Sequence, residues 1–353
     1  MAEKIVDYKP DRDMWNIAKG IGIIGIILGH CLEDPVANYL YMFHLQFFFF
    51  ISGYLYSENK YGDEPWLNVL SRLKRLWVPY FIIITVFVLL HNLFLTLGLQ
   101  LEGTDHYSLG QIVEKICYAM FGYADEFLAG PVWFLRTLAV AMIIFGFIIY
   151  ASRKLERRFH VVSKIIFQVV VTAALTVVGY IFIQSHIQLP CDMQISFTVL
   201  PFIYCGYVLR NYVGDITRYL NPFAAIISFV IVGVVSVYKD VDMTTGNVFP
   251  YMHLIALLGI YGCLYLSKLA SKWKVSSQIM SFVGEISLYI MAIHFFVIRG
   301  IDRISVLLFG HNAYELMSNA FMWVVYALVI CVVSVGISYG IKKLVDVIKG
   351  RQN

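Results

Sequence analysis

Residues 76–97 read LWVPYFIIITVFVLLHNLFLTL, with no Asp, Glu, Lys or Arg among them. A helix needs about 20 such residues to cross the hydrocarbon core of a bilayer. The other windows that are predominantly apolar are 16–32, 39–56, 131–150, 165–184, 194–210, 222–238, 249–267, 278–298 and 316–341. The sequence therefore predicts an all-α, polytopic integral membrane protein, a bundle of about ten transmembrane helices.

The composition supports this class. Hydrophobic residues make up 59% of the 353 residues and charged residues only 14%, whereas soluble domains carry about 25% charged residues. The net charge of +4 is spread over short loops, so nothing indicates a nucleic-acid partner. The six cysteines form no CxxC pair, and no metal is expected.

Basic residues concentrate in alternate loops. One set of loops and tails holds Lys4, Lys9, Arg12, Arg72, Lys74, Arg75, Arg153, Lys154, Arg157, Arg158, Lys164, Arg210, Arg218, Lys268, Lys272, Lys274, Lys342, Lys343, Lys349 and Arg351. The opposite set holds little beyond Lys115, Lys239 and Arg303. By the positive-inside rule, this predicts a multi-pass protein of the cell membrane with both termini in the cytoplasm.

The longest stretch outside the predicted spans, about 98–130 on the outer face, is too short for an independent domain. A single membrane domain is therefore expected over residues 1–353.

Two ionisable residues stand in the first predicted helix. Lys19 and His30 are eleven residues apart, which places them on one helix face, about 16 Å apart along the axis. Ionisable residues inside a span are costly and by default indicate a functional cavity. The structural alternatives are that Lys19 extends to the headgroups and that His30 is solvated near the outer end.

His44 opens the second predicted span, and we expect it at a depth similar to that of His30. Histidine is the usual general base near neutral pH, so two imidazoles in one cavity suit proton transfer. The alternative is one catalytic histidine and one that hydrogen-bonds a neighbouring helix, and spacing does not rank the two.

Arg72, Lys74 and Arg75 place three cations within four residues of a predicted cytoplasmic loop. Such a cluster suits an anionic ligand, because arginine binds phosphate through two hydrogen bonds. Taken alone, it equally fits ordinary positive-inside topology.

Five motifs in chain order are similar to those of the acyltransferase 3 family of membrane acyltransferases. They are Lys19-x10-His30, the segment from Phe43-His44 to Ser52-Gly53-Tyr54-Leu55, Arg72-x-x-Arg75, Pro131-Val132-Trp133-Phe134-Leu135, and Gly284-Glu285-Ile286-Ser287-Leu288-Tyr289 with His294 beyond. The similarity covers almost the whole chain and is greatest to the short, fucose acetylase-like and exopolysaccharide-modifying branch. Gln46 stands where many relatives carry proline, so the helix path near it is not carried over.

The resemblance implies transfer of an acyl group, usually acetyl from cytoplasmic acetyl-CoA, to a hydroxyl group of a cell-envelope sugar or polysaccharide. The implied partners are the lipid bilayer, acyl-CoA and the carbohydrate acceptor. The resemblance and the residue patterns together assign donor binding to Lys19, Arg72, Lys74 and Arg75, catalysis to His30 and His44, and the substrate path to Ser52, Trp133 and His294. Direct transfer and a histidine-acyl intermediate both remain open. Larger relatives append an esterase-like domain, which is not expected here.

A non-enzymatic transporter or exporter of a polysaccharide or envelope precursor is the alternative function. It predicts inverted repeats or broken helices in matched halves of the chain. The sequence indicates neither, although the glycine-rich first helix is a partial fit. Protection from thermal unfolding by CoA would favour the enzyme over the transporter.

Overall fold

The computed structural model describes residues 11–159, 161–243 and 251–350, which form helices and loops with no β-strand element. This confirms the all-α class. The α-helices are α1 (Arg12–Cys31), α2 (Val36–Tyr41), α3 (His44–Tyr54), α4 (Glu58–Tyr61), α5 (Pro65–Arg72), α6 (Val78–Thr96), α7 (Leu109–Met120), α8 (Trp133–Arg158), α9 (Val161–Gln184), α10 (Met193–Thr198), α11 (Leu200–Val208), α12 (Pro222–Tyr238), α13 (Met252–Ala270), α14 (Lys274–Glu285), α15 (Ser287–Phe309), α16 (Ala313–Leu316) and α17 (Ala320–Ile348).

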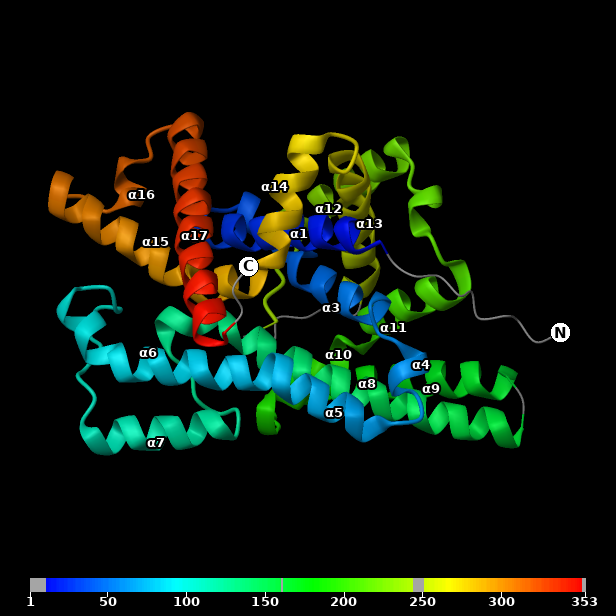
Figure 1. Ribbon diagram of the computed structural model, residues 1–353. Coiled ribbons are helices and arrows are strands. Elements are labelled where there is room, and N and C mark those ends of the chain that lie inside the picture. The colour runs from blue at the N-terminus through cyan, green and yellow to red at the C-terminus, as the bar shows by residue number, and fades with distance from the viewer. Residues whose placement is uncertain (1–10, 160, 244–250, 351–353) are drawn as a thin grey trace.

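Short π and 3-10 segments connect some of these helices. They are η1 (Leu73–Trp77), η2 (Phe127–Val132), η3 (Pro190–Asp192), η4 (Leu209–Val213) and η5 (Ile216–Tyr219). In Figure 1, α5, α6, α8 and α9 run in similar directions along one edge of the molecule, and α17 crosses that direction.

Helix length and composition identify fewer spans than the sequence predicts. Among the described residues, six helices are long and apolar enough to cross a membrane, or up to eight if two bent pairs each form one span. The two remaining predicted segments are also helical, but 39–56 is broken into α2 and α3, and α12 has only 17 residues. The count of ten and the cytoplasmic termini therefore stay predictions.

The two bent pairs fall within predicted spans 194–210 and 278–298. The first bends by 52° between Thr198 and Leu200, just before Pro201, which occupies the first turn of α11 and supplies no backbone N–H to the preceding turn. The second bends by 79° between α14 and α15. The prediction of one uninterrupted helix in each window was wrong, because periodicity reports apolar length and not direction. That each bent pair forms one span stays a prediction.

The break between α2 and α3 shapes the centre of the molecule. Phe43 leaves the helical region, with φ −148° and ψ −14°, so α2 ends at Tyr41 and α3 begins at His44. Its ring packs against Gly259 of α13, where a Cβ atom would lie 2.4 Å from the Phe43 ring. The break turns both Tyr41 and His44 toward the end of α1.

Glycines bring helix backbones into direct contact. A Cβ atom on Gly20 of α1 would lie 2.2 Å from the Met280 carbonyl oxygen, and one on Gly284 of α14 would lie 1.8 Å from the Asn16 carbonyl oxygen. Such approach requires residues without side chains, as is common where membrane helices cross. Because of it, α14 packs along the Lys19 half of α1.

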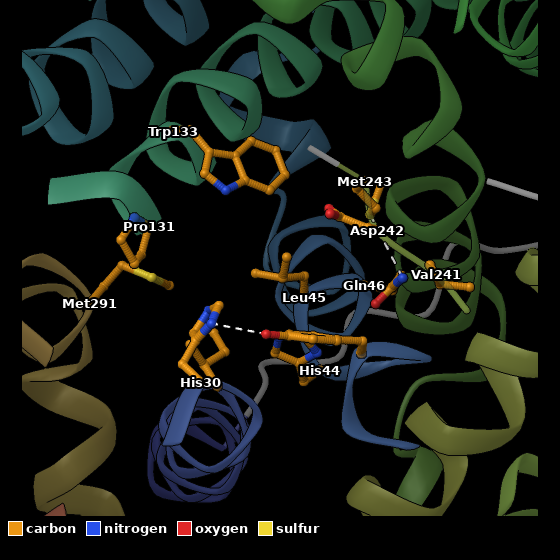
Figure 2. A pocket seen from close by; sticks show the side chains of 12 residues that line it. His30, His44, Leu45, Gln46, Pro131, Trp133, Val241, Asp242, Met243 and Met291 are labelled. Carbon is orange, nitrogen blue, oxygen red and sulfur yellow. Dashed lines mark hydrogen bonds between the residues drawn. The ribbon is translucent and has the colours of Figure 1, made fainter. Parts of the chain in front are cut away.

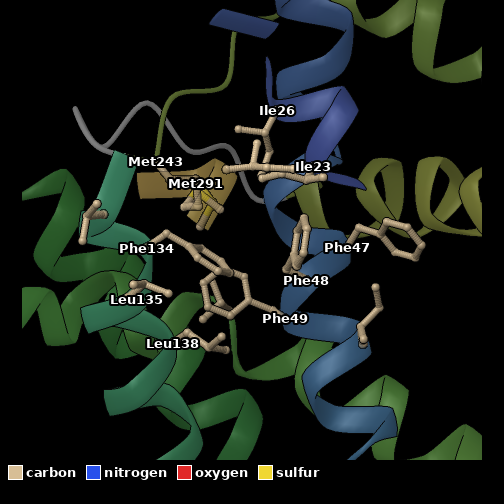
Figure 3. Packing of buried hydrophobic residues seen from close by; sticks show 14 of the residues in the cluster. Ile23, Ile26, Phe47, Phe48, Phe49, Phe134, Leu135, Leu138, Met243 and Met291 are labelled. Carbon is tan, nitrogen blue, oxygen red and sulfur yellow. The ribbon is translucent and has the colours of Figure 1, made fainter. Parts of the chain in front are cut away.

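Large apolar side chains fill the space between α1, α3 and α8. Phe49 and Phe134 have ring centroids 5.0 Å apart, and both are buried. Ile23 of α1 is also buried and lies near this cluster (Figure 3). Since Ile23 lies between Lys19 and His30 in the sequence, this apolar layer separates the two ends of α1.

The stretch 98–130 contains a helix that the sequence analysis did not predict. Ser108 caps the N-terminus of α7 by accepting a hydrogen bond from the Gln111 backbone N–H, and the Gln111 side chain accepts one from the Ser108 N–H. Most of α7 is exposed. The segment after α7, residues 121–132, forms one wall of the site described below.

Candidate active site

His30 lies at the C-terminal end of α1 and faces Tyr41, the last residue of α2. Its Nδ1 is 3.0 Å from the Tyr41 hydroxyl oxygen, and the imidazole and the Phe295 ring form a T-shaped pair with centroids 4.8 Å apart. The Tyr41 contact orients the ring and occupies Nδ1. It leaves Nε2 as the nitrogen for a substrate.

Two further histidines surround His30. The ring centroid of His44 lies 6.4 Å from that of His30, and the centroid of His294, on α15, lies 5.4 Å away. His44 Nδ1 is 2.7 Å from the Leu40 carbonyl oxygen, and His294 Nδ1 is 3.1 Å from the Ile290 carbonyl oxygen.

A carbonyl oxygen only accepts hydrogen bonds, so Nδ1 carries the proton in both His44 and His294. In the neutral form, each Nε2 is then a bare acceptor. Both Nε2 atoms are buried and have no hydrogen-bond partner among the described residues. A buried polar atom without a partner is costly, which is typical of a site that awaits a ligand.

A cavity of about 140 Å³, here called the histidine cavity, opens between these side chains. Its lining includes His30, Tyr41, His44, Trp133 and Asp242. Figure 2 shows the indole nitrogen of Trp133 on the side of its ring that faces the histidines. The cavity therefore combines imidazole nitrogens with hydrogen-bond donors in largely apolar surroundings.

A larger cavity of about 680 Å³, the acidic cavity, adjoins the first one. His30, Pro131 and Trp133 line both. The acidic cavity is also bounded by Asp125 and by Arg136, which forms an ion pair with Asp192. His30 thus stands where two cavities meet.

At the other end of α1, Lys19 lines a third cavity of about 550 Å³, the basic cavity. Among the described residues, the cations around it are Arg12, Lys19, Arg210 and Lys342, and the one carboxylate is Glu285. Glu285 pairs with Arg12 at 3.8 Å and accepts a hydrogen bond from Asn16. The surplus of positive charge suits a phosphate-bearing ligand.

Comparison with known proteins was made at three levels. A family model described as an acyltransferase domain, acyltransferase 3, matches residues 13–343. The chain belongs to the acyltransferase 3 family. Searches of curated proteins and of solved structures found no significant match. With its long apolar helices, this acyltransferase is a multi-pass membrane protein.

In the acyltransferase, the cations predicted to bind the donor fall into two groups. Lys19 lines the basic cavity, whereas Arg72, Lys74 and Arg75 do not. Arg72 donates from Nε to the Asn68 side chain at 3.0 Å and stacks on the Tyr61 ring at 5.4 Å, while Lys74 and Arg75 are exposed.

The segment from Tyr54 to Tyr61 connects these two groups. Arg210 of the basic cavity donates to the Tyr56 carbonyl oxygen at 2.7 Å. The Tyr56 and Tyr61 rings are 5.7 Å apart, and Arg72 lies over the latter.

The residues predicted to line the substrate path have different positions in the acyltransferase. Trp133, the first residue of α8, lines both the histidine and the acidic cavity. His294 is fully buried beside His30 but does not line either cavity. Ser52 is half-buried in α3 and does not line the histidine, acidic or basic cavity.

Sequence reasoning missed two side chains of this site. Tyr41 was not identified from the sequence, because its contact with His30 depends on the break after α2. Arg136 lies inside predicted span 131–150, and an ionisable residue in a span is itself a signal of function. The described residues contain no group of three His, Cys, Asp or Glu side chains that could hold a metal ion.

Proposed function

We propose that the protein transfers an acyl group, acetyl in the simplest case, from acyl-CoA to a hydroxyl group of a cell-envelope sugar or polysaccharide. The observation that carries this proposal is the position of His30. It is oriented by Tyr41, flanked by His44 and His294, and lies where two cavities meet. Membership of the acyltransferase 3 family supports acyl transfer as the reaction.

The basic cavity supports an anionic donor. Its cations would bind the phosphates of CoA, and Lys19 lies on the same helix as His30, about 16 Å away along the axis. The extended pantetheine arm spans about 15–20 Å, which matches this separation. Arg72, Lys74 and Arg75 would make a further set of phosphate contacts across segment 54–61.

The apolar layer between the two ends of α1 lies across the route from the basic cavity to His30. The basic and histidine cavities share no lining residue, and Phe48, Phe49 and Phe134 pack between their helices. We propose that the pantetheine arm enters when the Phe48 side chain rotates away. A Phe side chain can rotate, whereas the backbone contacts between α1 and α14 hold these two helices in place.

The chemistry follows from the histidine arrangement. In direct transfer, His30 Nε2 takes the proton of the acceptor hydroxyl, the hydroxyl oxygen attacks the thioester carbonyl, and the C–S bond breaks. The proton then passes to the CoA thiolate. In the stepwise route, Nε2 itself attacks the thioester carbonyl, the C–S bond breaks and the CoA thiolate leaves. The acceptor hydroxyl oxygen then attacks the acyl carbon, the C–N bond breaks, and the hydroxyl proton passes to the thiolate. A hydrogen bond from the Trp133 indole N–H would stabilise the carbonyl oxygen in either route.

Reconstitution tests the proposal. The purified protein in lipid vesicles is supplied with radiolabelled acetyl-CoA and a polysaccharide extract from an acetylation-negative strain. We expect alkali-labile acetyl esters on the polysaccharide, and none with a His30→Gln variant. Vesicles that bind or move polysaccharide without consuming acetyl-CoA would instead support a transporter.

A further inference from the structure

The acidic cavity beside His30 has the size and the surface of a binding site for a sugar ring. Its volume of about 680 Å³ lies within the range of about 300–1,000 Å³ that is typical of small-molecule sites. We infer that it holds the acceptor, and that it selects pyranosides that are neutral or carry an amino group over pyranosides that carry a carboxylate. This rests on the proposed function, because it names the acceptor class for the same reaction.

The position of the cavity makes it suitable for an acceptor. His30, Pro131 and Trp133 line it together with the histidine cavity. A sugar that fills the acidic cavity therefore presents its hydroxyl groups to His30. The basic cavity has no lining residue in common with it, so donor and acceptor would approach His30 from different directions.

Aromatic rings form part of the surface of the acidic cavity. Phe127 and Phe295 lie with ring centroids 6.1 Å apart, and Trp133 adds a larger face. Tyr123 also lines the cavity and is 54% exposed. Flat apolar faces beside polar groups suit a pyranose, whose C–H faces are apolar and whose rim carries hydroxyl groups.

Arg136 is the only Lys or Arg side chain that lines the acidic cavity in the described part of the chain. It is 5% exposed and already has partners. One guanidinium NH2 group pairs with Asp192, and the other donates to the Gly122 carbonyl oxygen at 2.6 Å and lies 3.8 Å from Asp125. Its buried Nε–H has no hydrogen-bond partner among the described residues and would suit a hydroxyl oxygen.

The carboxylates outnumber this one guanidinium. The Asp125 side chain is 83% exposed, and that of Asp192 is 25% exposed. Glu126 also lines the cavity, but its Oε1 faces His91 at 2.9 Å and its Oε2 accepts from Tyr107 at 3.3 Å. Asp125 and Asp192 exceed Arg136 by one negative charge even before Glu126 is counted, and this surplus attracts an ammonium group and repels a carboxylate.

Three ligands with one ring type test this inference: the methyl β-glycosides of glucose, glucosamine and glucuronic acid. Saturation-transfer NMR measures their binding to the full-length protein in nanodiscs, and acetyl transfer from labelled acetyl-CoA is measured in parallel. We expect the glucuronide to bind on the order of tenfold more weakly than the other two. An Asp125→Lys variant should reverse this order, because Asp125 is the exposed carboxylate.

A Glu102→Lys variant is the matched control. Glu102 is an exposed carboxylate of the same segment that lines a different cavity, so this change adds the same charge without altering the acidic cavity. Equal effects of the two variants, or tightest binding of the glucuronide by the unaltered protein, would overturn the inference. Absence of binding by all three glycosides would also overturn it.

The binding and transfer results separate the two proposals. The expected binding order without acetyl transfer would support the acidic cavity as a sugar site and contradict the proposed reaction. Acetyl transfer without charge selection would support the reaction and contradict the selectivity.

Discussion

At the Lys19 end of α1, four cations and one carboxylate of the described residues surround a cavity, whereas at the His30 end the helix faces imidazoles, a tyrosine and aromatic rings. The first environment suits a ligand that is recognised by its charge. The second places nitrogen acceptors in apolar surroundings, which suits proton transfer. One helix therefore carries two kinds of chemistry, and a packed apolar layer keeps them about three turns apart.

This comparison also indicates which parts are rigid. Around Lys19, the glycine contacts hold the backbones of α1 and α14 together, so the helix there has little freedom to move. Around His30, the neighbours are side chains and the broken α2–α3 connection. We therefore expect substrate-dependent motion near the histidines and in the apolar layer, and little at the crossing of α1 and α14.

The sharpest test of the comparison asks whether the two ends face opposite sides of the membrane. His106→Cys reports the His30 end, and Lys349→Cys reports the Lys19 end; both residues are exposed. In a background without the native cysteines, an impermeant maleimide added to intact cells should label the first and not the second. Labelling of both from outside, or only of Lys349→Cys, would contradict the predicted orientation.

The second test compares the histidines at the His30 end. Removal of a general base typically costs about 100- to 10,000-fold in rate, so we expect this loss in acetyl transfer for His30→Gln. Acyl-CoA binding should persist because the cations are distant. His44→Gln is tested in parallel. The His44 Nδ1 is bound to a backbone carbonyl, so that only its Nε2 could accept a proton. Near-normal transfer by His30→Gln together with inactive His44→Gln would move the catalytic role to α3.

The third test asks which cations bind the donor. Charge-assisted hydrogen bonds contribute about 1.5–3 kcal/mol each, so we expect Lys19→Ala with Lys342→Ala to weaken acyl-CoA binding by about ten- to a hundredfold per residue. Arg72→Ala with Arg75→Ala should act similarly if that loop also contacts phosphate. The dissociation constant for acyl-CoA is measured by titration calorimetry.

Lys343→Ala serves as the control for this test, because Lys343 is exposed beside Lys342 and lies outside the basic cavity. Its affinity should equal that of the unaltered protein. If both double variants also retain full affinity, the cations are topology signals only and the donor proposal is wrong.

The smallest expected effect concerns the orientation of His30. Tyr41→Phe removes one hydrogen bond to its Nδ1, worth about 0.5–1.5 kcal/mol. We expect kcat to fall about two- to tenfold while the KM for the acceptor stays the same, since the residue acts through His30. Tyr39→Phe, on the same short helix, should leave kcat unchanged. A change in KM alone would indicate that Tyr41 contacts the substrate instead.

The sequence by itself determined the all-α membrane class, the family and the pairing of Lys19 with His30 on one helix. These follow from apolar run length, motif order and the 3.6-residue period, all of which are local properties. It also predicted His44 at a depth similar to that of His30 from the order of the spans, and it predicted Trp133 and His294 on the substrate path through the resemblance to the family.

Only the tertiary structure decided which of these residues meet. The break at Phe43 brings Tyr41 to His30, and the fold brings Arg136, Asp192 and Asp125 into one cavity although they are separated in sequence. The bends within two predicted spans and the separation of Arg72 from Lys19 likewise depend on packing between distant segments. Hydrophobic periodicity contains no information about such contacts, because it describes each helix alone and not the backbone approach that glycines or side-chain shape permit.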